Sequence, residues 1–221
     1  MTDSGSMSSV RISTDAFPER ARLALWREIY GRNIVNVDIE PLDDRPFHAS
    51  VLFHALPGLG VAIGSRSDAS CIGSRRGLAK TQDQVILTLA TKGEYCLAQL
   101  GREIAGGPGS GALLSGADPG SATLRGDGAF VTLAFPRAAL QALVPDLGAV
   151  LARPIPASNE ALRLLTGYLR VFKNLDGPMS PAASRAFATH VLDLTALAVG
   201  ACGESGEIAA CARPGSTPCC G

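Results

Sequence analysis

The sequence predicts an α+β fold in which an antiparallel β-barrel follows one helix and precedes a helical hairpin. Short segments that alternate apolar and polar residues fill the middle of the chain, and glycine, proline and aspartate separate them. No helical pattern lies between these segments, which argues against a parallel sheet built from βαβ units. Helical patterns occur only before and after them.

The first element is an amphipathic helix. Residues 1–13 are polar, and we expect them to be disordered. Asp15 and Pro18 suit the first turn of a helix, and apolar side chains then recur at spacings of three and four until about Gly31. These apolar positions are Leu23, Trp26, Ile29 and Tyr30.

The strand segments come next and are short. Their spacing, with turn residues between them, is typical of an antiparallel sandwich or barrel. The segments expected to be strands are 35–40, 46–56, 59–66, 84–91, 94–100, 102–105, 112–115, 121–125 and 129–135.

Residues 99–120, QLGREIAGGPGSGALLSGADPG, could be a phosphate-binding loop or a series of turns. A phosphate-binding loop leads into a helix and ends in lysine followed by serine or threonine. No lysine lies between Lys92 and Lys173, and the glycines lead into another short strand segment. We therefore interpret them as turns, for which glycine is suited because it takes positive φ at little steric cost.

Helical patterns return at 136–144, 159–175 and 181–201. The second of these carries two adjacent apolar stripes, whereas a helix packed on one neighbour needs only one. We expect the extra stripe to pair two copies of the chain, although a helix buried in a larger monomer would show the same pattern. The residues assigned to the dimer interface are Leu164, Leu165, Tyr168, Val171 and Phe172.

Composition excludes several classes of protein. The formal net charge is zero, so the chain lacks the basic balance of a nucleic-acid binder. The N-terminus has no apolar segment of the kind found in signal peptides, and the most apolar run, 186–202, is too short and polar to span a membrane. The six cysteines include no C-x-x-C pair. We expect a soluble cytoplasmic protein with free thiols and no membrane partner.

No catalytic or metal-binding constellation is readable, so we expect no enzyme activity, no cofactor and no metal. The three histidines, His48, His54 and His190, lack the close His-x-His spacing and nearby carboxylate that a metal-binding barrel would need.

A small barrel can hold one ligand inside, so the inward faces of the strands supply the candidate pocket. The residues assigned to ligand binding are Phe47, Val51, Phe53, Leu89 and Tyr95. Tyr95 is the strongest of these, because it joins an apolar ring to a polar tip. The alternative for each is an ordinary core residue.

An ordered set of segments resembles the N-terminal ligand-sensing domain of AraC-type transcriptional regulators, a cupin-like barrel followed by helices. No segment is specific alone, but together they cover about residues 13–201. The segments are TDAFPERARLALWREIYGRNIVNVDIEPLDDRPFHA (14–49), LPGL (56–59), QLGREI (99–104), GALLSGADPG (111–120), FPRAAL (135–140), RPIP (153–156), ALRLLTGYL (161–169) and ATHVLDLTALAVGA (188–201).

The resemblance implies a small-molecule effector, a homodimer and a second domain with two helix-turn-helix units that reads DNA. Only residues 202–221 follow Ala201, and they are rich in cysteine, glycine and proline. We therefore expect a regulator truncated before its DNA-binding domain, with no specific DNA binding by this chain alone. A truncation or frameshift near residue 202 would explain this, and the downstream nucleotide sequence would test it.

The expected organisation is a disordered N-terminus (1–13), a cupin-like sensor barrel with its leading helix (14–145), a helical dimerisation region (146–201) and an unstructured tail (202–221). The alternatives are a cupin-type metal-dependent enzyme, which metal analysis would reveal, and a remnant without function.

Overall fold

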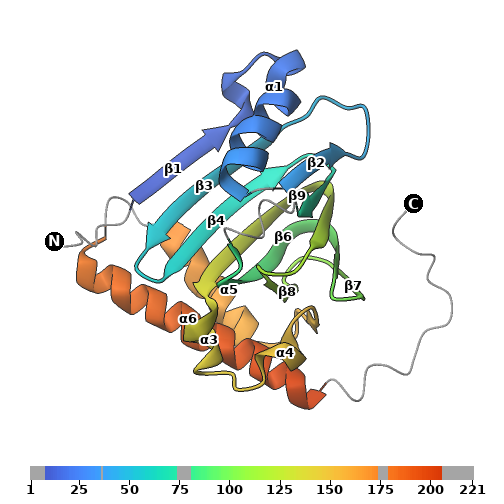
Figure 1. Ribbon diagram of the computed structural model, residues 1–221. Helices are drawn as coiled ribbons and strands as arrows, with labels where there is room; N and C mark the ends of the chain where they lie inside the picture. Colours follow the sequence, from blue (N-terminus) through green and yellow to red (C-terminus); the bar gives the residue numbers. More distant parts are fainter. Residues whose placement is uncertain (1–7, 36, 74–80, 174–178, 206–221) are drawn as a thin grey trace.

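The computed structural model describes residues 8–35, 37–73, 81–173 and 179–205. A curled antiparallel sheet forms the centre of the molecule, with one helical layer on each side (Figure 1). This arrangement confirms the predicted α+β class, its leading helix and its C-terminal helical hairpin. No helix within the described ranges is both long and apolar enough to span a bilayer.

The N-terminal segment departs from the prediction. Residues 8–13 do not lie in a disordered terminus but form strand β1, Ser8–Ser13, which pairs antiparallel with β3, Ala49–Leu56. The pairing gives the backbone groups along the edge of β3 their hydrogen-bond partners, which the polar composition of this segment does not reveal. Residues 1–7 lie outside the described ranges.

The leading helix is split in a way that the apolar spacing did not predict. A 3₁₀ turn, η1 (Thr14–Ala16), precedes α1 (Glu19–Trp26), and the chain then continues as a π-helix, η2 (Arg27–Val35). Trp26 and Tyr30 stack with their ring centroids 4.5 Å apart and are both buried. Gly31 lies so close to the next strand that a Cβ there would be 2.9 Å from the carbonyl oxygen of Val37.

The strands all pair antiparallel, in the order β1-β3-β4-β9-β6-β8-β10, while β5 joins β2 to β9 and β7 pairs with β6. Within the described residues these pairings do not form a closed ring, and the sheet curls instead. The remaining strands are β2 (Val37–Pro41), β4 (Leu59–Arg66), β5 (Ala69–Gly73), β6 (Gln84–Gln99), β7 (Arg102–Gly106), β8 (Gly111–Ser115), β9 (Gly120–Pro136) and β10 (Pro154–Ile155).

Two long strands allow the sheet to curl. β6 and β9 pair from Gln84 opposite Pro136 to Gln99 opposite Gly120, with shifts in register near Lys92. The sequence predicted two strands in each of these segments, because the glycines between them resemble turns. These glycines instead lie in a bulge, which bends a strand without ending it.

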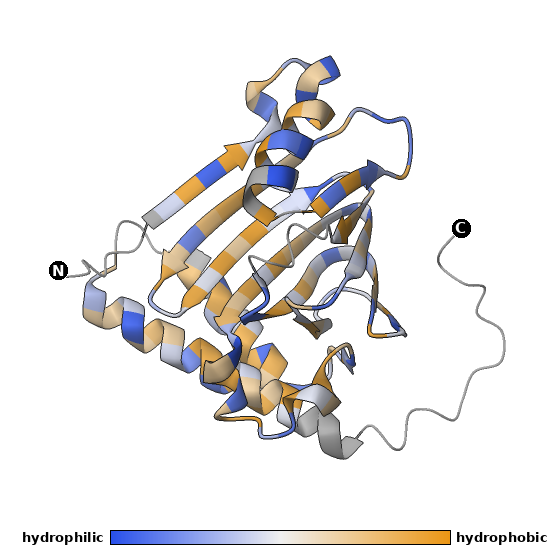
Figure 2. Cartoon of the chain, viewed as in Figure 1, coloured by the Kyte–Doolittle hydropathy of each residue, from blue (hydrophilic) through white to orange (hydrophobic). Residues whose placement is uncertain are grey.

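The two faces of the sheet carry separate cores, because successive side chains of a strand point to opposite faces. On one face, Trp26 and Tyr30 pack against Val51 and Ala62. The opposite face supplies Val61, Val85, Leu87 and Leu133 to a larger core shared with the C-terminal helices. Figure 2 shows hydrophobic residues recurring along β3, β4 and β9, which lie between the two helical layers.

The C-terminal helices are α3 (Arg137–Gln141), α4 (Leu147–Val150), α5 (Glu160–Lys173) and α6 (Pro181–Ser205). Asn159 caps α5, since its Oδ1 accepts from the backbone N–H of Leu162 at 2.9 Å. Its Nδ2 donates to the carbonyl of Ala198 at 3.0 Å and so ties α5 to α6. Helix α6 extends beyond the predicted end at Ala201, and residues 206–221 lie outside the described ranges.

Candidate functional site

The curled sheet encloses a hollow of about 230 Å³. Its walls come from η2 and from strands β2, β4, β5, β6, β8 and β9, so that residues distant in the sequence meet there. The lining residues are Tyr30, Val35, Val37, Arg66, Cys71, Ile86, Thr88, Leu89, Ala90, Tyr95, Leu97, Leu114, Ala122, Thr123, Leu124, Phe130 and Thr132.

The bulge in β6 decides which of its side chains enter the hollow. Before the bulge, Ile86 and Thr88 line it, while Leu87 points into the core under the C-terminal helices. After the bulge, Tyr95 and Leu97 line it. Apart from Leu89, which borders both the hollow and that core, the register shift moves the inward side chains from even to odd positions, as an inserted residue must in a strand of period two.

Arg66 is the charged residue of this hollow. It stands at the end of β4 and is only 8% exposed. Its Nη1 donates to the carbonyl of Ala69 at 3.0 Å and to Sγ of Cys71 at 3.1 Å. Its Nη2 donates to the carbonyl of Ala122 at 3.3 Å. These bonds hold the guanidinium against β5 and β9.

Two weak acids lie beside Arg66 and stay neutral at pH 7. Burial raises the pKa of the Cys71 thiol, although Arg66 opposes this shift. Burial also raises the pKa of Tyr30, with a smaller contribution from Cys71 and an opposing one from Arg66. A thiol and a phenol therefore face the hollow in their protonated forms.

Tyr95 supplies a further polar group. Its hydroxyl lies 3.3 Å from the hydroxyl of Ser110, which donates to the carbonyl of Gly107 at 2.7 Å. Burial raises the pKa of Tyr95, so this hydroxyl is also protonated at pH 7. A protonated hydroxyl can both donate to and accept from a ligand.

A smaller hollow of about 160 Å³ adjoins the first and shares six of its lining residues. Gln99 lies there, but its amide is already occupied. Its Nε2 donates to the carbonyls of Ser115 and Asp118, and its Oε1 accepts from the N–H of Ser115. Gln99 therefore fixes the turn between β8 and β9, and both of its amide N–H donors are used within the protein.

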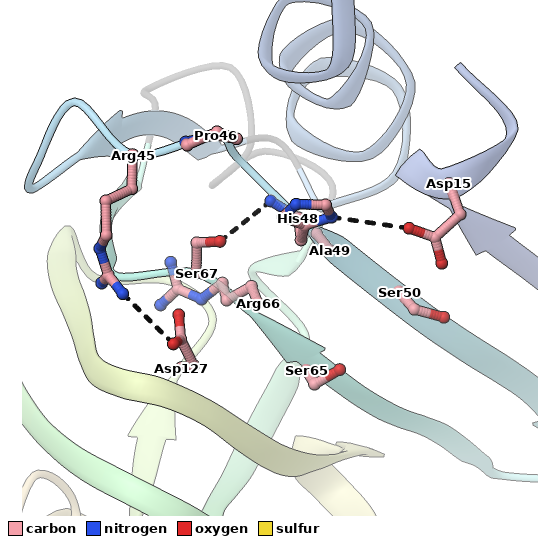
Figure 3. A pocket seen from close by; sticks show the side chains of 10 residues that line it. All are labelled: Asp15, Arg45, Pro46, His48, Ala49, Ser50, Ser65, Arg66, Ser67 and Asp127. Atoms are coloured by element: carbon pink, nitrogen blue, oxygen red, sulfur yellow. Dashed lines mark hydrogen bonds and ion pairs between the residues drawn. The ribbon is translucent and has the colours of Figure 1, made fainter. Parts of the chain in front are cut away.

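An outer hollow of about 410 Å³ is polar and lies at the ends of β3 and β4 (Figure 3). Arg45 pairs there with Asp43 at 2.8 Å, Asp127 at 3.3 Å and Asp68 at 3.7 Å. The hydrogen bond from Arg45 lowers the pKa of Asp43. Arg66 is the one described residue that lines both this outer hollow and the inner one.

The described residues contain no cluster of three histidine, cysteine, aspartate or glutamate side chains that could hold a metal ion. The histidines lie far apart in the fold. His48 is beside Asp15 at the outer hollow, at 3.6 Å. His54 packs against Phe172 under the sheet, and His190 lies 3.2 Å from the hydroxyl of Tyr168 on α5.

The residues predicted to bind a ligand divide into two groups. Leu89 and Tyr95 line the inner hollow. Phe47, Val51 and Phe53 do not line it, because α1 and η2 cover that part of the sheet and these side chains pack beneath them.

Sequence reasoning missed Tyr30, Arg66 and Cys71. One signal was available for Arg66, since it continues the same strand face as Ala62 and Gly64 in the predicted strand 59–66. A charged residue at the end of an inward-facing row of side chains is a signal for a candidate ligand contact. Cys71 lies on β5, a strand that the sequence did not predict.

The residues predicted to form a dimer interface also divide. Leu164 is 65% exposed, whereas Leu165 and Phe172 are buried in the chain's own core. Tyr168 is half-buried, with its ring stacked on Phe187 at 4.9 Å. Val171 is helical, but its side chain is not among those described. On α6 the structure adds Leu197, which is 62% exposed.

Comparison with known proteins gives one family match. The model of the AraC-binding-like domain matches residues 26–199. No curated protein sequence matches the chain.

Among solved structures, the AraC-like transcriptional activator CuxR has a similar fold, with a TM-score of 0.71 and 18% identity over 96% of this chain and 73% of that one. The match to the EutQ protein of Clostridium difficile (TM-score 0.34, 12% identity) covers 44% of this chain and 76% of the EutQ chain. KdgF from Halomonas sp. (TM-score 0.34, 14% identity) covers 45% of this chain and 86% of its own.

Proposed function

The chain belongs to the AraC-binding-like domain family, and from this premise we propose that its curled sheet is a sensor that holds a small-molecule effector. The observation that carries the proposal is the inner hollow of about 230 Å³. It combines an apolar wall with a few polar groups that converge from separate strands. Ligand sites commonly have this composition, because apolar contacts supply affinity and a few polar groups fix orientation.

The residues that line the inner hollow suit the binding of a ligand better than the catalysis of a reaction. Neither histidine nor a carboxylate is among the described residues that line the inner hollow. Its titratable groups are Tyr30, Cys71 and Tyr95, all with a raised pKa, together with Arg66. General acid–base catalysis near pH 7 needs a group whose pKa lies near 7, and nucleophilic catalysis needs an activating base. A regulatory role in transcription therefore suits this site better than an enzyme.

The position of Leu89 suggests how ligand binding in the inner hollow affects the packing of the C-terminal helices. Leu89 lines the inner hollow and also belongs to the core that packs under α5 and α6. A ligand that shifts Leu89 would change packing beneath these helices, because close-packed cores transmit small displacements.

We further propose that α5 and α6 pair with the same helices of a second copy. Leu164 and Leu197 are large apolar side chains left exposed, one on each of these packed helices. A twofold interface would bury each residue against the partner. Sedimentation velocity should show a wild-type dimer that Leu164→Glu and Leu197→Glu convert to folded monomer. Thr189→Glu, at an exposed position on α6, is the matched control. A wild-type monomer at high concentration would contradict the pairing.

The sensor proposal is tested by a thermal-shift screen with small metabolites, since a ligand that prefers the folded state raises the Tm. Thr132→Leu should fill part of the inner hollow and weaken any ligand found, measured by calorimetry. Glu103→Gln, at an exposed position of β7, should leave the affinity unchanged. If no metabolite shifts the Tm, or if Thr132→Leu binds every hit as tightly as wild type, the inner hollow is not the effector site.

A further inference from the structure

We propose that the effector is a small apolar carboxylic acid whose carboxylate binds the guanidinium of Arg66 inside the curled sheet. This inference rests on the proposed sensor function and names the chemical class of its ligand. Four features of the inner hollow carry it, namely an uncompensated charge, unused hydrogen-bond donors, an apolar remainder and a small volume.

Arg66 is a buried cation without an acidic partner. Within the described residues, no carboxylate oxygen lies within 4.0 Å of its guanidinium, and the nearby aspartates pair with Arg45 instead. Burial of an unpaired charge is costly, so buried arginines normally have an anionic partner. Cys71 and Tyr30 are protonated at pH 7 and cannot supply that charge. An anionic ligand would supply it.

The hydrogen bonds of Arg66 leave a place for that anion. A guanidinium has five N–H donors. Three are used, two from Nη1 to Ala69 and Cys71 and one from Nη2 to Ala122. The Nε–H and one Nη2–H have no acceptor in the described part of the chain. On one edge of a guanidinium the Nε–H and an Nη2–H are parallel and match the two oxygens of a carboxylate, whereas a phosphate would leave its remaining oxygens without donors of comparable strength.

The rest of the lining is mostly apolar, with hydroxyl groups from Tyr30, Tyr95 and three threonines among it. Its apolar members include Leu89, Leu97, Leu114, Leu124 and Phe130, and no second cation is among the described lining residues. A single negative charge on a largely hydrocarbon body fits this distribution, while a polyanion would bury further charges without a cation to pair with them. Because about 230 Å³ is below the ~300–1,000 Å³ range of sites for drug-sized ligands, we expect roughly a dozen non-hydrogen atoms or fewer.

The test compares acids with their primary amides, which have nearly the same shape and no charge. Straight-chain and aromatic monocarboxylic acids of about six to ten carbons are titrated into the full chain by calorimetry at pH 7, where they are ionised. At least one acid should bind about tenfold more tightly than its amide. Arg66→Gln should weaken that acid about 10- to 100-fold and leave the amide within about threefold, since hydrogen bonds to charged groups are the stronger ones.

Arg45→Gln is the matched control, because Arg45 lines the outer hollow and the aspartates that pair with it do not pair with Arg66. It should leave acid affinity within about twofold. If Arg66→Gln fails to fold, wild type still decides between acids and amides, and Thr132→Leu still tests the location without altering Arg66.

The outcomes separate the two proposals. Amides that bind as tightly as acids would overturn the carboxylate inference and leave the sensor function standing. Acids that bind folded Arg66→Gln or Thr132→Leu as tightly as wild type would place the anion elsewhere and also overturn it. If no acid binds while a neutral metabolite raises the Tm, the ligand class is wrong. If nothing binds at all, the sensor function itself fails.

Discussion

Nη1 of Arg66 lies 3.1 Å from Sγ of Cys71, inside the curled sheet. The pair joins the end of β4 to β5, two strands that follow one another along β9 and both pair with it. Burial raises the pKa of the thiol and the neighbouring guanidinium lowers it, and burial dominates. Cys71 is therefore a neutral thiol in the wall of the inner hollow and can report on what occupies it.

The first prediction concerns the reactivity of Cys71. Only the thiolate is alkylated, so a raised pKa together with burial should make Cys71 react at pH 7.5 about tenfold or more slowly than in the urea-unfolded chain. Peptide mapping by mass spectrometry after timed exposure to iodoacetamide measures the rate. A bound effector should slow it further. Equal alkylation rates in native and unfolded protein would show that the Cys71 thiol is not buried and that its pKa is not raised.

The second prediction compares neighbouring residues on β9. Leu133 is 0% exposed and packs in the core under the C-terminal helices, whereas Thr132 lines the inner hollow. Leu133→Ala should lower the free energy of unfolding by about 2–5 kcal/mol, measured with urea, because it leaves a cavity. Thr132→Val should change it by no more than about 1 kcal/mol and alter ligand affinity instead. If Thr132→Val lowered the free energy of unfolding more than Leu133→Ala, the two faces of β9 would be misassigned.

The strands and the C-terminal helices could be predicted because apolar periodicity records which face of an element is buried. The same periodicity could not show that β6 and β9 are single long strands. Gly93 has φ of +78° within β6, and in the sequence it resembles a turn residue. A bulge and a turn call for the same residue types, so only the pairing partners distinguish them.

The site was partly predictable for a related reason. The inward face of β3 was identified correctly, but alternation does not show what packs on it. Trp26 and Tyr30 cover Phe47 and Val51 there, and the ligand space begins farther along the sheet. Two acceptors of Arg66, Ala69 and Cys71, are close to it in the sequence, but the contact with Ala122 forms only when β9 pairs with β4 and β5, which is long-range information that a local pattern does not contain.

The third prediction concerns the turn between β6 and β7. Gln99 pairs with Arg102, so Leu100 and Gly101 form a two-residue loop, with φ of +55° and +70°. Positive φ at both positions favours asparagine followed by glycine, and a leucine there is strained. Leu100→Asn should therefore raise the free energy of unfolding by about 0.5–1 kcal/mol.

Gly101→Ala should lower the free energy of unfolding by about 1 kcal/mol through backbone strain, since a Cβ at this position would meet nothing within 4 Å. Gly107→Ala is the control, because its φ is not positive and a Cβ there also meets nothing within 4 Å. Urea unfolding measures all three variants. Stabilisation by Gly101→Ala would contradict the assigned turn.

The fourth prediction concerns the pH dependence of stability. His54 stands on β3 with its ring edge-on to Phe172 of α5, at 4.9 Å between centroids. Both ring nitrogens are buried and have no hydrogen-bond partner among the described residues. Burial lowers the pKa of His54 below its usual 6.5. The unfolded chain therefore binds a proton more readily than the folded one.

Because the unfolded state takes up the proton first, the free energy of unfolding should fall as the pH decreases below about 6.5 and stop falling below the folded-state pKa. Urea unfolding between about pH 5 and 7.5 measures this slope. His54→Phe should abolish it, whereas His190→Phe, at an exposed position of α6, should leave it. The lowered pKa of Asp43 acts only below its usual 3.8, outside this range. A slope that survives His54→Phe would assign the titration to another group.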